Sequence, residues 1–347
     1  MGPREARLHV GGGGTGVSTG AGPFTYYHSL GGGGGSRRGR SRARPDARPA
    51  APSGTVVRPT AKAARVRLLA EEVALIENLH RQRFDPAVPR SAPVPVLPDR
   101  EELRADLERE HLRGTWFWQL SRRAAARRRA ADEADRRLAE LAAKAQTAHR
   151  AEQARLDEQW RALVRNEPQA VLTEVAASFE DNAAPAAPVG VDGAELSIVV
   201  LVPGLDAVPD HTPGVTAAGN PSLRKASATW RWDLYQQLVA GHALVSVREA
   251  FAVAPGIARV TVVVLRDEGP DVYGRPRAEP VLATRIDRAA LDGVRWQDVS
   301  AWEVVEQLGR DTLLETRGRA DEVMPLDLAE QPDLRALVES VDLEDLD

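Results

Sequence analysis

Residues 196–202 read LSIVVLV, and residues 259–266 read RVTVVVLR. Both runs are short and almost entirely apolar, and most of their side chains are β-branched, which is typical of strands buried on both faces of a sheet. The residues between them, 222–254, carry apolar side chains at helical spacing and predict one long helix. Its stripe consists of Leu234, Leu238, Leu244, Val247 and Phe251. This strand–helix–strand pattern predicts a sheet with helices packed on it.

The flanking residues extend this pattern to a domain over residues 168–328. An amphipathic helix at 168–182 precedes a hairpin with Asp192 and Gly193 in its turn. A third strand at 281–286 and a helix at 298–308 follow the second apolar strand. The predicted order is α-ββ-α-ββ-α, so the fold class is α+β. The remaining residues, 329–347, are expected to form an acidic tail.

Two helical segments lie before this domain. Residues 60–84 predict a helix with a candidate oligomer seam at 3-4-3 spacing, formed by Val66, Leu69, Val73 and Ile76. A Pro-rich spacer at 85–99 follows, and it is expected to be extended and semi-rigid.

Residues 100–165 then predict a long, coiled-coil-like helix with Asp99 as its N-cap. Its stripe includes Leu138, Leu141, Ala145 and Ala148, and Gly114 is a point where the helix could bend or break. The helical middle therefore resembles one or two coiled-coil arms.

The first 59 residues have a different composition. Residues 1–30 are glycine-rich and predict short strands at most, and residues 31–59 predict a disordered basic and Pro-rich linker. This linker carries five closely spaced arginines that form a candidate polyanion-binding arm: Arg37, Arg38, Arg40, Arg42 and Arg44. Residues 1–50 carry eight arginines against Glu5 and Asp46, a net charge of +6, whereas residues 321–347 carry ten acids against Arg335, a net charge of −9. The two ends could therefore bind each other or a partner.

Several classes of site are disfavoured by composition. The chain has no cysteine, so disulfides, thiolate zinc sites and cysteine nucleophiles are excluded. None of the three lysines follows a glycine, which excludes a P-loop, and the seven histidines show no metal-ligand spacing. No run reaches the ~18 apolar residues of a membrane span, and no apolar signal core is present. We predict a cytoplasmic protein without catalytic residues, metal, cofactor or membrane partner.

Four weaker patterns remain as hypotheses. Residues 16–20, GVSTG, match the nucleophile-elbow pattern, and glycines at 11, 13 and 16 match a dinucleotide pattern, but no helix follows either of them. Asp210, Glu249 and Asp267 could form a metal-dependent nuclease site, although surface acids are the expected interpretation. The cluster at 116–118, WFW, is expected to pack against helix 60–84, with a partner anchor or membrane-surface insertion as alternatives.

Several stretches together resemble a known but uncharacterised protein family of high-GC bacteria. They are residues 158–160 (EQW), Asn166, the run from Phe179 to Gly193, the strand end at 201–203 and residues 248–255 (REAFAVAP). The resemblance implies a glycine-rich N-terminal domain of unknown function, a helical middle and a C-terminal α/β domain. It implies no activity, cofactor or catalytic residue.

The leading functional hypothesis is a non-enzymatic, self-associating interaction or scaffold protein, with helices as the self-contact and the loop at 204–221 as a further binding surface. An alternative is a nucleic-acid- or polyanion-associated accessory protein that uses the arginine arm. A third is an enzyme with an unrecognised site, which a deep pocket lined by acids and His211 or His242 would favour.

Overall fold

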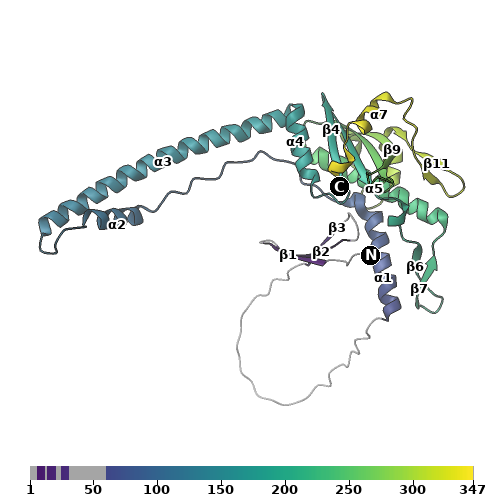
Figure 1. Ribbon diagram of the computed structural model, residues 1–347, viewed down its shortest axis with the longest axis horizontal. Coiled ribbons are helices and arrows are strands. Elements are labelled where there is room, and N and C mark those ends of the chain that lie inside the picture. The colour runs from purple at the N-terminus through teal and green to yellow at the C-terminus, as the bar shows by residue number, and fades with distance from the viewer. Residues whose placement is uncertain (1–5, 12–13, 21–24, 31–59, 347) are drawn as a thin grey trace, which may run out of the picture. The chain divides into compact units, whose positions relative to one another are not determined.

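The computed structural model describes residues 6–11, 14–20, 25–30 and 60–346 (Figure 1). The chain divides into two compact units, one formed by Met1–Pro86 with Val171–Asp347 and the other by Ala87–Ala170. The first unit contains a five-stranded sheet with helices packed on it, and the second is a helical hairpin. The predicted α+β class is confirmed.

The central sheet has the strand order β10-β9-β8-β5-β4. Its middle strands β5 (Glu195–Val202) and β8 (Arg259–Asp267) are the two apolar runs, and they pair in parallel. Strand β9 (Ala278–Asp287) lies antiparallel to β8. The edges are β4 (Ala186–Asp192), which forms a hairpin with β5, and the short β10 (Arg310–Leu313).

Helix α5 (Ala228–Val253) connects the two parallel strands and contacts both. Parallel pairing requires such a crossover, because the chain has to return to the end of the sheet where the first strand began. The expected helix at 222–254 starts later than predicted. Residues 221–225 form strand β7 instead, and the Ser227 hydroxyl caps the helix by accepting from the Trp230 amide at 3.1 Å.

The C-terminal segment packs on the opposite face of the sheet. Helix α7 (Pro332–Glu339) and the residues around it place apolar side chains against Val199, Val263 and Ala283. These side chains include Leu326, Leu328, Leu334, Leu337 and Val338. Residues 329–347 are therefore not simply an acidic tail. Their sequence mixes acids with leucine and valine, and the leucine and valine side chains pack against the sheet.

Further short elements lie along the chain between β9 and α7. They are the 3-10 helix η3 (Arg288–Leu291), helix α6 (Ala301–Leu308) and the hairpin of β11 (Glu315–Arg317) with β12 (Glu322–Met324). Helix α6 packs on α5 and begins with a capping box between Ser300 and Glu303. Helix α4 (Pro168–Phe179) precedes β4 and buries Val171, Val175 and Phe179.

Helix α1 (Ala61–Asn78) and the 3-10 turn η1 (Leu79–Arg81) belong to the same unit as the sheet. They pack on α5 and on a hairpin formed by β6 (His211–Val215) and β7 (Pro221–Lys225). The loop expected at 204–221 thus contains a short turn, η2 (Leu205–Ala207), and strand β6, which supports α1. Gly241 of α5 permits the close approach, because a Cβ there would lie 3.0 Å from Leu79 Cβ.

The second unit consists of α2 (Arg100–His111) and α3 (Leu120–Val164), which pack on each other. The single helix predicted for 100–165 is interrupted at residues 112–119, where Gly114 has a φ of +78°. The side chain of Asp99 caps α2 as predicted, by accepting from the amides of Glu101 and Glu102.

The Pro-rich spacer is extended and lies along α3. The Ala92 amide donates to the Gln153 side-chain oxygen at 2.8 Å, and the His149 ring is 3.1 Å from the Pro93 carbonyl oxygen. Farther along, Arg100 donates two hydrogen bonds to the Asp135 carboxylate. The spacer and α2 therefore run antiparallel to α3.

The glycine-rich start of the chain contains three short strands. Strands β1 (Ala6–Gly11), β2 (Gly14–Gly20) and β3 (Thr25–Leu30) pair antiparallel in that order. Among the described residues, no helix is both long enough and apolar enough to cross a bilayer.

Candidate interaction surfaces

The candidate oligomer seam lies on the covered side of α1. Val66, Leu69 and Val73 are half-buried and Ile76 is buried, whereas most other positions of this helix are exposed. Since α1 contacts α5, β6 and β7, the chain's own first unit covers the seam. Its 3-4-3 spacing therefore has an intramolecular explanation.

The stripe predicted on the long helix is divided between two sides of α3. Leu138 and Ala145 are half-buried, whereas Leu141 and Ala148 are exposed, Leu141 by 42%. A shallow open groove in the middle of α3 is lined by Ala143, Lys144, Thr147, Ala148 and Ala151. The exposed part of the stripe thus belongs to a surface of mostly small side chains.

The turn between α2 and α3 carries the WFW cluster. The rings of Trp116 and Trp118 stack with centroids 4.9 Å apart, and the edge of Phe117 meets Trp118 at 4.8 Å. The three side chains are 61%, 75% and 59% exposed in sequence order, and Leu120 beside them is 75% exposed. The rings contact each other and are not covered by the rest of the hairpin, and the prediction that they pack against helix 60–84, which belongs to the other unit, stays a prediction.

Tight turns place these rings side by side. The Thr115 amide donates to the Leu112 carbonyl at 3.1 Å, and the Gln119 amide donates to the Trp116 carbonyl at 3.0 Å. The positive φ of Gly114 lets the chain leave α2 and enter these turns. Backbone hydrogen bonding in the turn therefore presents the aromatic side chains outward.

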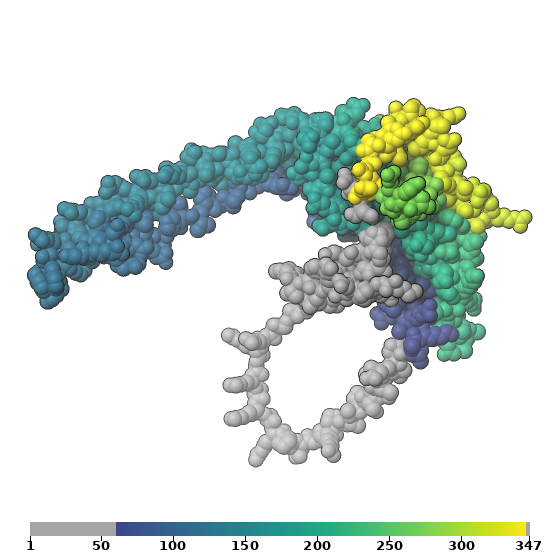
Figure 2. Space-filling model, viewed as in Figure 1, coloured from purple at the N-terminus to yellow at the C-terminus, as the bar shows by residue number. Residues whose placement is uncertain are grey.

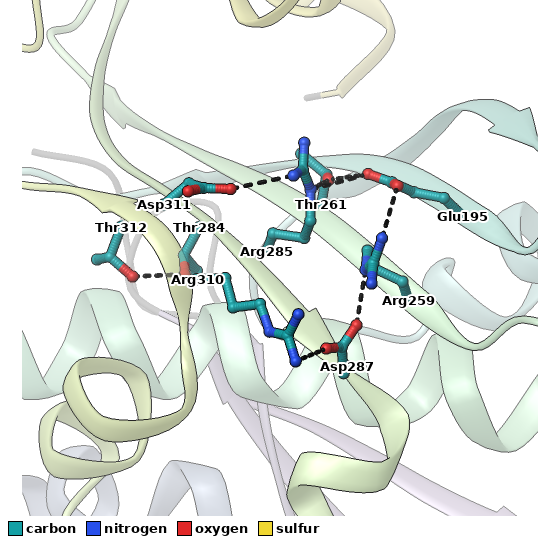
Figure 3. A network of polar contacts seen from close by, with 9 residues as sticks. All are labelled: Glu195, Arg259, Thr261, Thr284, Arg285, Asp287, Arg310, Asp311 and Thr312. Atoms are coloured by element: carbon teal, nitrogen blue, oxygen red, sulfur yellow. Dashed lines mark hydrogen bonds and ion pairs between the residues drawn. The ribbon is translucent and has the colours of Figure 1, made fainter.

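A polar network lies on side chains of β5, β8, β9 and β10, on the sheet face that also packs against α7 (Figure 3). At its centre Glu195 Oε1 accepts from Thr261 Oγ1 at 2.6 Å and from Arg285 Nε at 3.1 Å. A second nitrogen of Arg285 donates to Asp311 at 3.0 Å. This group ties β5, β8 and β9 to the edge strand β10.

The same network continues across the sheet edge (Figure 3). Arg259 and Arg310 donate to the two oxygens of Asp287 at 2.6 and 2.8 Å, and Thr284 and Thr312 share a hydrogen bond of 2.8 Å. Three arginines thus face three carboxylates, and the neighbouring Asp287 raises the pKa of Arg259. Because its charges are paired internally, the network is a clamp on the sheet and offers little unsatisfied charge to a ligand.

A second cluster, built by His80, Arg248 and Trp296, joins α1 to α5. The Arg248 guanidinium lies 4.0 Å above the Trp296 ring and donates to the His80 carbonyl oxygen. The His80 ring is buried, with Nε2 2.9 Å from the Val299 carbonyl oxygen, and burial lowers its pKa. These contacts fix the end of α1 on the domain.

Burial shifts the pKa values of two titratable side chains on α5. Burial lowers the pKa of His242 to about 4, so this histidine is neutral at pH 7. Burial also raises the pKa of Glu249 to about 7, and the nearby Asp181 adds to the rise. Burial therefore keeps both side chains uncharged over part of the neutral range.

The acids proposed for a nuclease site have separate partners. Asp210 contacts the His211 ring at 2.7 Å, which lowers the Asp210 pKa, and Asp267 accepts from the Gly269 amide at 2.7 Å. Glu249 lies in α5 beside Asp181. In the described part of the chain, no group of three or more His, Asp or Glu side chains is arranged to hold a metal ion.

A pocket of about 460 Å³ lies between α6 and the strands that follow it. Its lining includes two carboxylates, those of Glu306 and Asp321, together with Gln236 and Trp302. Neither His211 nor His242 lines it, so it lacks the histidine that would favour an enzyme site.

The remaining motifs are placed by the strands at the start of the chain. Ser18 of the GVSTG motif lies within β2 and pairs with Tyr27 of β3, not at a strand-to-helix turn. Gly13 of the dinucleotide pattern and the arm arginines, Arg37, Arg38, Arg40, Arg42 and Arg44, lie outside the described residues.

No protein-family model, curated protein or solved structure matches this chain. The resemblance to a family of high-GC bacteria therefore stays a prediction.

Sequence reasoning missed the sheet-face network and the cluster around Arg248. Alternation along β5, β8 and β9 offered a signal for the network, because Glu195, Thr261 and Arg285 occupy the same face once the strands are in register. The Arg248 cluster joins residues more than 150 positions apart, and no local pattern indicates such a contact.

Proposed function

We propose that the protein is a non-enzymatic, self-associating interaction protein of the cytoplasm, and that α3 forms the contact between copies. The carrying observation is one exposed side of α3 at residues 143–151, which α2 and the Pro-rich spacer leave uncovered. This helix has 45 residues and a length of about 67 Å. Its partner α2 has 12 residues and a length of about 18 Å.

The groove on α3 supports a second copy as its occupant. Ala143, Thr147 and Ala151 repeat every four residues and allow another helix to approach closely. A two-fold contact brings the same surface of both copies together, so a shallow groove of small side chains is matched by its own equivalent. Leu141 beside the groove would lose its exposure in such a pair.

Light scattering on the full-length protein at low and high salt tests this proposal. We expect an oligomer that persists in high salt, because burial of apolar surface is not screened. The double variant Leu141→Asp/Ala148→Asp should be a monomer, because four carboxylates would meet in each pair. Leu68→Asp, on an exposed side of α1, is the matched control and should stay oligomeric.

A monomeric wild-type protein, or a double variant with unchanged mass, would contradict self-association through α3. The nucleic-acid alternative stays a prediction that rests on the arginine arm. Absorbance at 260 nm on the same peak distinguishes it, because bound nucleic acid would raise this signal at low salt and leave at high salt.

A further inference from the structure

The turn of the hairpin exposes a contiguous apolar cluster. Trp116, Phe117, Trp118 and Leu120 lie within five residues, and each is more than half exposed. The turn forms the blue end of the hairpin, and no other hairpin segment lies over it in the view shown (Figure 2). Single exposed apolar side chains are ordinary, but contiguous patches mark surfaces that meet a protein or a membrane.

The charges around this cluster differ from those in the rest of the hairpin. Residues 109–129 contain seven arginines and one acid, Glu110, for a net charge of +6. Six of these arginines form no ion pair with an acid among the described residues, and we call them the arginine collar. They are Arg113, Arg122, Arg123, Arg127, Arg128 and Arg129.

Most other arginines of the hairpin have acidic partners among the described residues, with Arg136 and Arg150 as exceptions. Arg100 pairs with Asp135 at 2.7 Å, Arg137 with Glu133 at 2.6 Å and Arg155 with Glu152 at 2.6 Å. The contrast shows that unpaired positive charge is concentrated beside the exposed aromatic cluster. A surface that complements both features must offer an apolar layer to the aromatic side chains and a neighbouring anionic layer to the arginines.

A bilayer with anionic headgroups has this layering. Tryptophan rings favour the headgroup level, because they combine an apolar body with a polar N–H, and nearby arginines are attracted to lipid phosphates. Stacking on nucleobases fits less well, because Trp116 and Trp118 are nearly parallel, at 16°, and cover each other's inner faces. The observations therefore favour lipid over nucleic acid.

We propose that the α2–α3 turn is a peripheral anchor that inserts Trp116, Phe117 and Trp118 into the headgroup region of an anionic lipid surface. The arginine collar holds the turn there by contact with lipid phosphates. This is a surface contact and requires no helix that crosses the bilayer. It uses other residues than the α3 groove, so it stands or falls independently of self-association.

Flotation of the full-length protein with vesicles tests the anchor. Vesicles of phosphatidylcholine with phosphatidylglycerol should bind the protein, and vesicles of phosphatidylcholine alone should bind it much less. Binding should weaken as salt rises, because the collar's attraction is screened. The triple variant Trp116→Ala/Phe117→Ala/Trp118→Ala should lower the partition coefficient by about 100-fold, because three large side chains no longer leave water.

Two further variants make the result specific. Val88→Ala/Val94→Ala/Val96→Ala removes three other exposed apolar side chains from the same unit and should bind as the wild type does. Changing the five arm arginines, Arg37, Arg38, Arg40, Arg42 and Arg44, to Gln should also leave most binding intact. The circular dichroism of each variant should match that of the wild type, because the changed side chains of the tip are exposed.

The proposal is overturned if anionic vesicles do not bind the protein at low salt. It is equally overturned if the aromatic variant binds unchanged while the arm variant loses binding, since the arm would then be the anchor. Binding of short duplex DNA that competes with vesicles and is lost in the aromatic variant would replace lipid by nucleic acid as the partner.

Discussion

Helices α5 and α3 are the two longest helices described, and they are stabilised in different ways. Fourteen of the 26 residues of α5 are buried, between the sheet on one side and α1 and α6 on others. Only five of the 45 residues of α3 are buried, and four of these are alanines. Tertiary packing therefore determines α5, whereas α3 depends on helix propensity and on local ion pairs such as Arg161 with Glu158.

The difference teaches how an apolar stripe should be interpreted. Both α1 and α3 carry heptad-like stripes, but the stripe on α1 is used within the chain because α5 offers a broad apolar surface. The stripe on α3 has only a short helix and a Pro-rich segment to cover it. Spacing alone indicates that a stripe will be covered, and the available neighbours decide whether the cover comes from the same chain.

The largest expected effect on stability comes from placing a charge on the side of α1 that packs against α5. Ile76→Asp should lower the free energy of unfolding by about 3–4 kcal/mol, because Ile76 is 6% exposed and a carboxylate there would be desolvated without a partner. Leu141→Asp on α3 should change it by less than about 0.5 kcal/mol when the variant and the wild type are both measured at a concentration low enough to be monomeric, so that the contact between copies does not contribute. Urea denaturation followed by tryptophan fluorescence measures both variants.

Leu68→Asp is the control for helix α1 itself, because Leu68 is 66% exposed. Leu68→Asp should behave like the α3 variant. It changes the same helix as Ile76→Asp and lowers the helix propensity by a similar amount, but it buries no charge. If Ile76→Asp were as mild as Leu68→Asp, the packing of α1 on α5 would not contribute to stability, and the contrast between the two helices would fail.

Much of this architecture could be predicted from the sequence. The apolar runs of β5 and β8, the long connecting helix and the break at Gly114 all follow from periodicity and from backbone preferences. The packing of the C-terminal helix α7 on the sheet was missed because ten acids in residues 321–347 outweigh the few leucines and valines that reach the sheet. Net charge describes the exposed side of such a segment and conceals its buried side.

The candidate surfaces were harder to predict. The WFW cluster was identified from the sequence. Its exposure depends on the turn at 112–119, because no other side chain of the turn covers the three rings. The arginine collar was not identified either, because arginines are frequent along the whole chain. Only the three-dimensional pairing of the others shows which arginines lack an acid.

A second test removes a side chain that caps the C-terminal end of α5. The Arg288 guanidinium donates to the carbonyl oxygens of Phe251, Ala254 and Ile257 at 2.7–2.8 Å, and it lies over the Phe251 ring. Arg288→Met should lower the free energy of unfolding by about 2–3 kcal/mol, because carbonyl groups at the end of the helix lose their donors.

Arg295→Met is the matched control, since Arg295 is 85% exposed on its side chain and its Asp298 contact is long, at 3.8 Å. Urea denaturation should show a change of less than about 0.5 kcal/mol for this variant. Equal effects of the two substitutions would show that α5 needs no side-chain cap and would weaken the view that tertiary contacts define it.

The smallest expected effect concerns Glu249 and depends on pH. Its pKa is about 7 in the folded chain, against 4.5 for the ordinary side chain, so between these values the folded state holds a proton that the unfolded state releases. The free energy of unfolding therefore falls as pH rises from 4.5 to 7. Glu249→Gln should gain about 1 kcal/mol at pH 8, a value discounted because the side chain is partly exposed, and should change nothing near pH 4. Asp181→Asn should shift the same transition to lower pH, because Asp181 contributes to the raised pKa. A gain of equal size at both pH values would mean that the amide improves packing and that burial on α5 does not penalise the charge.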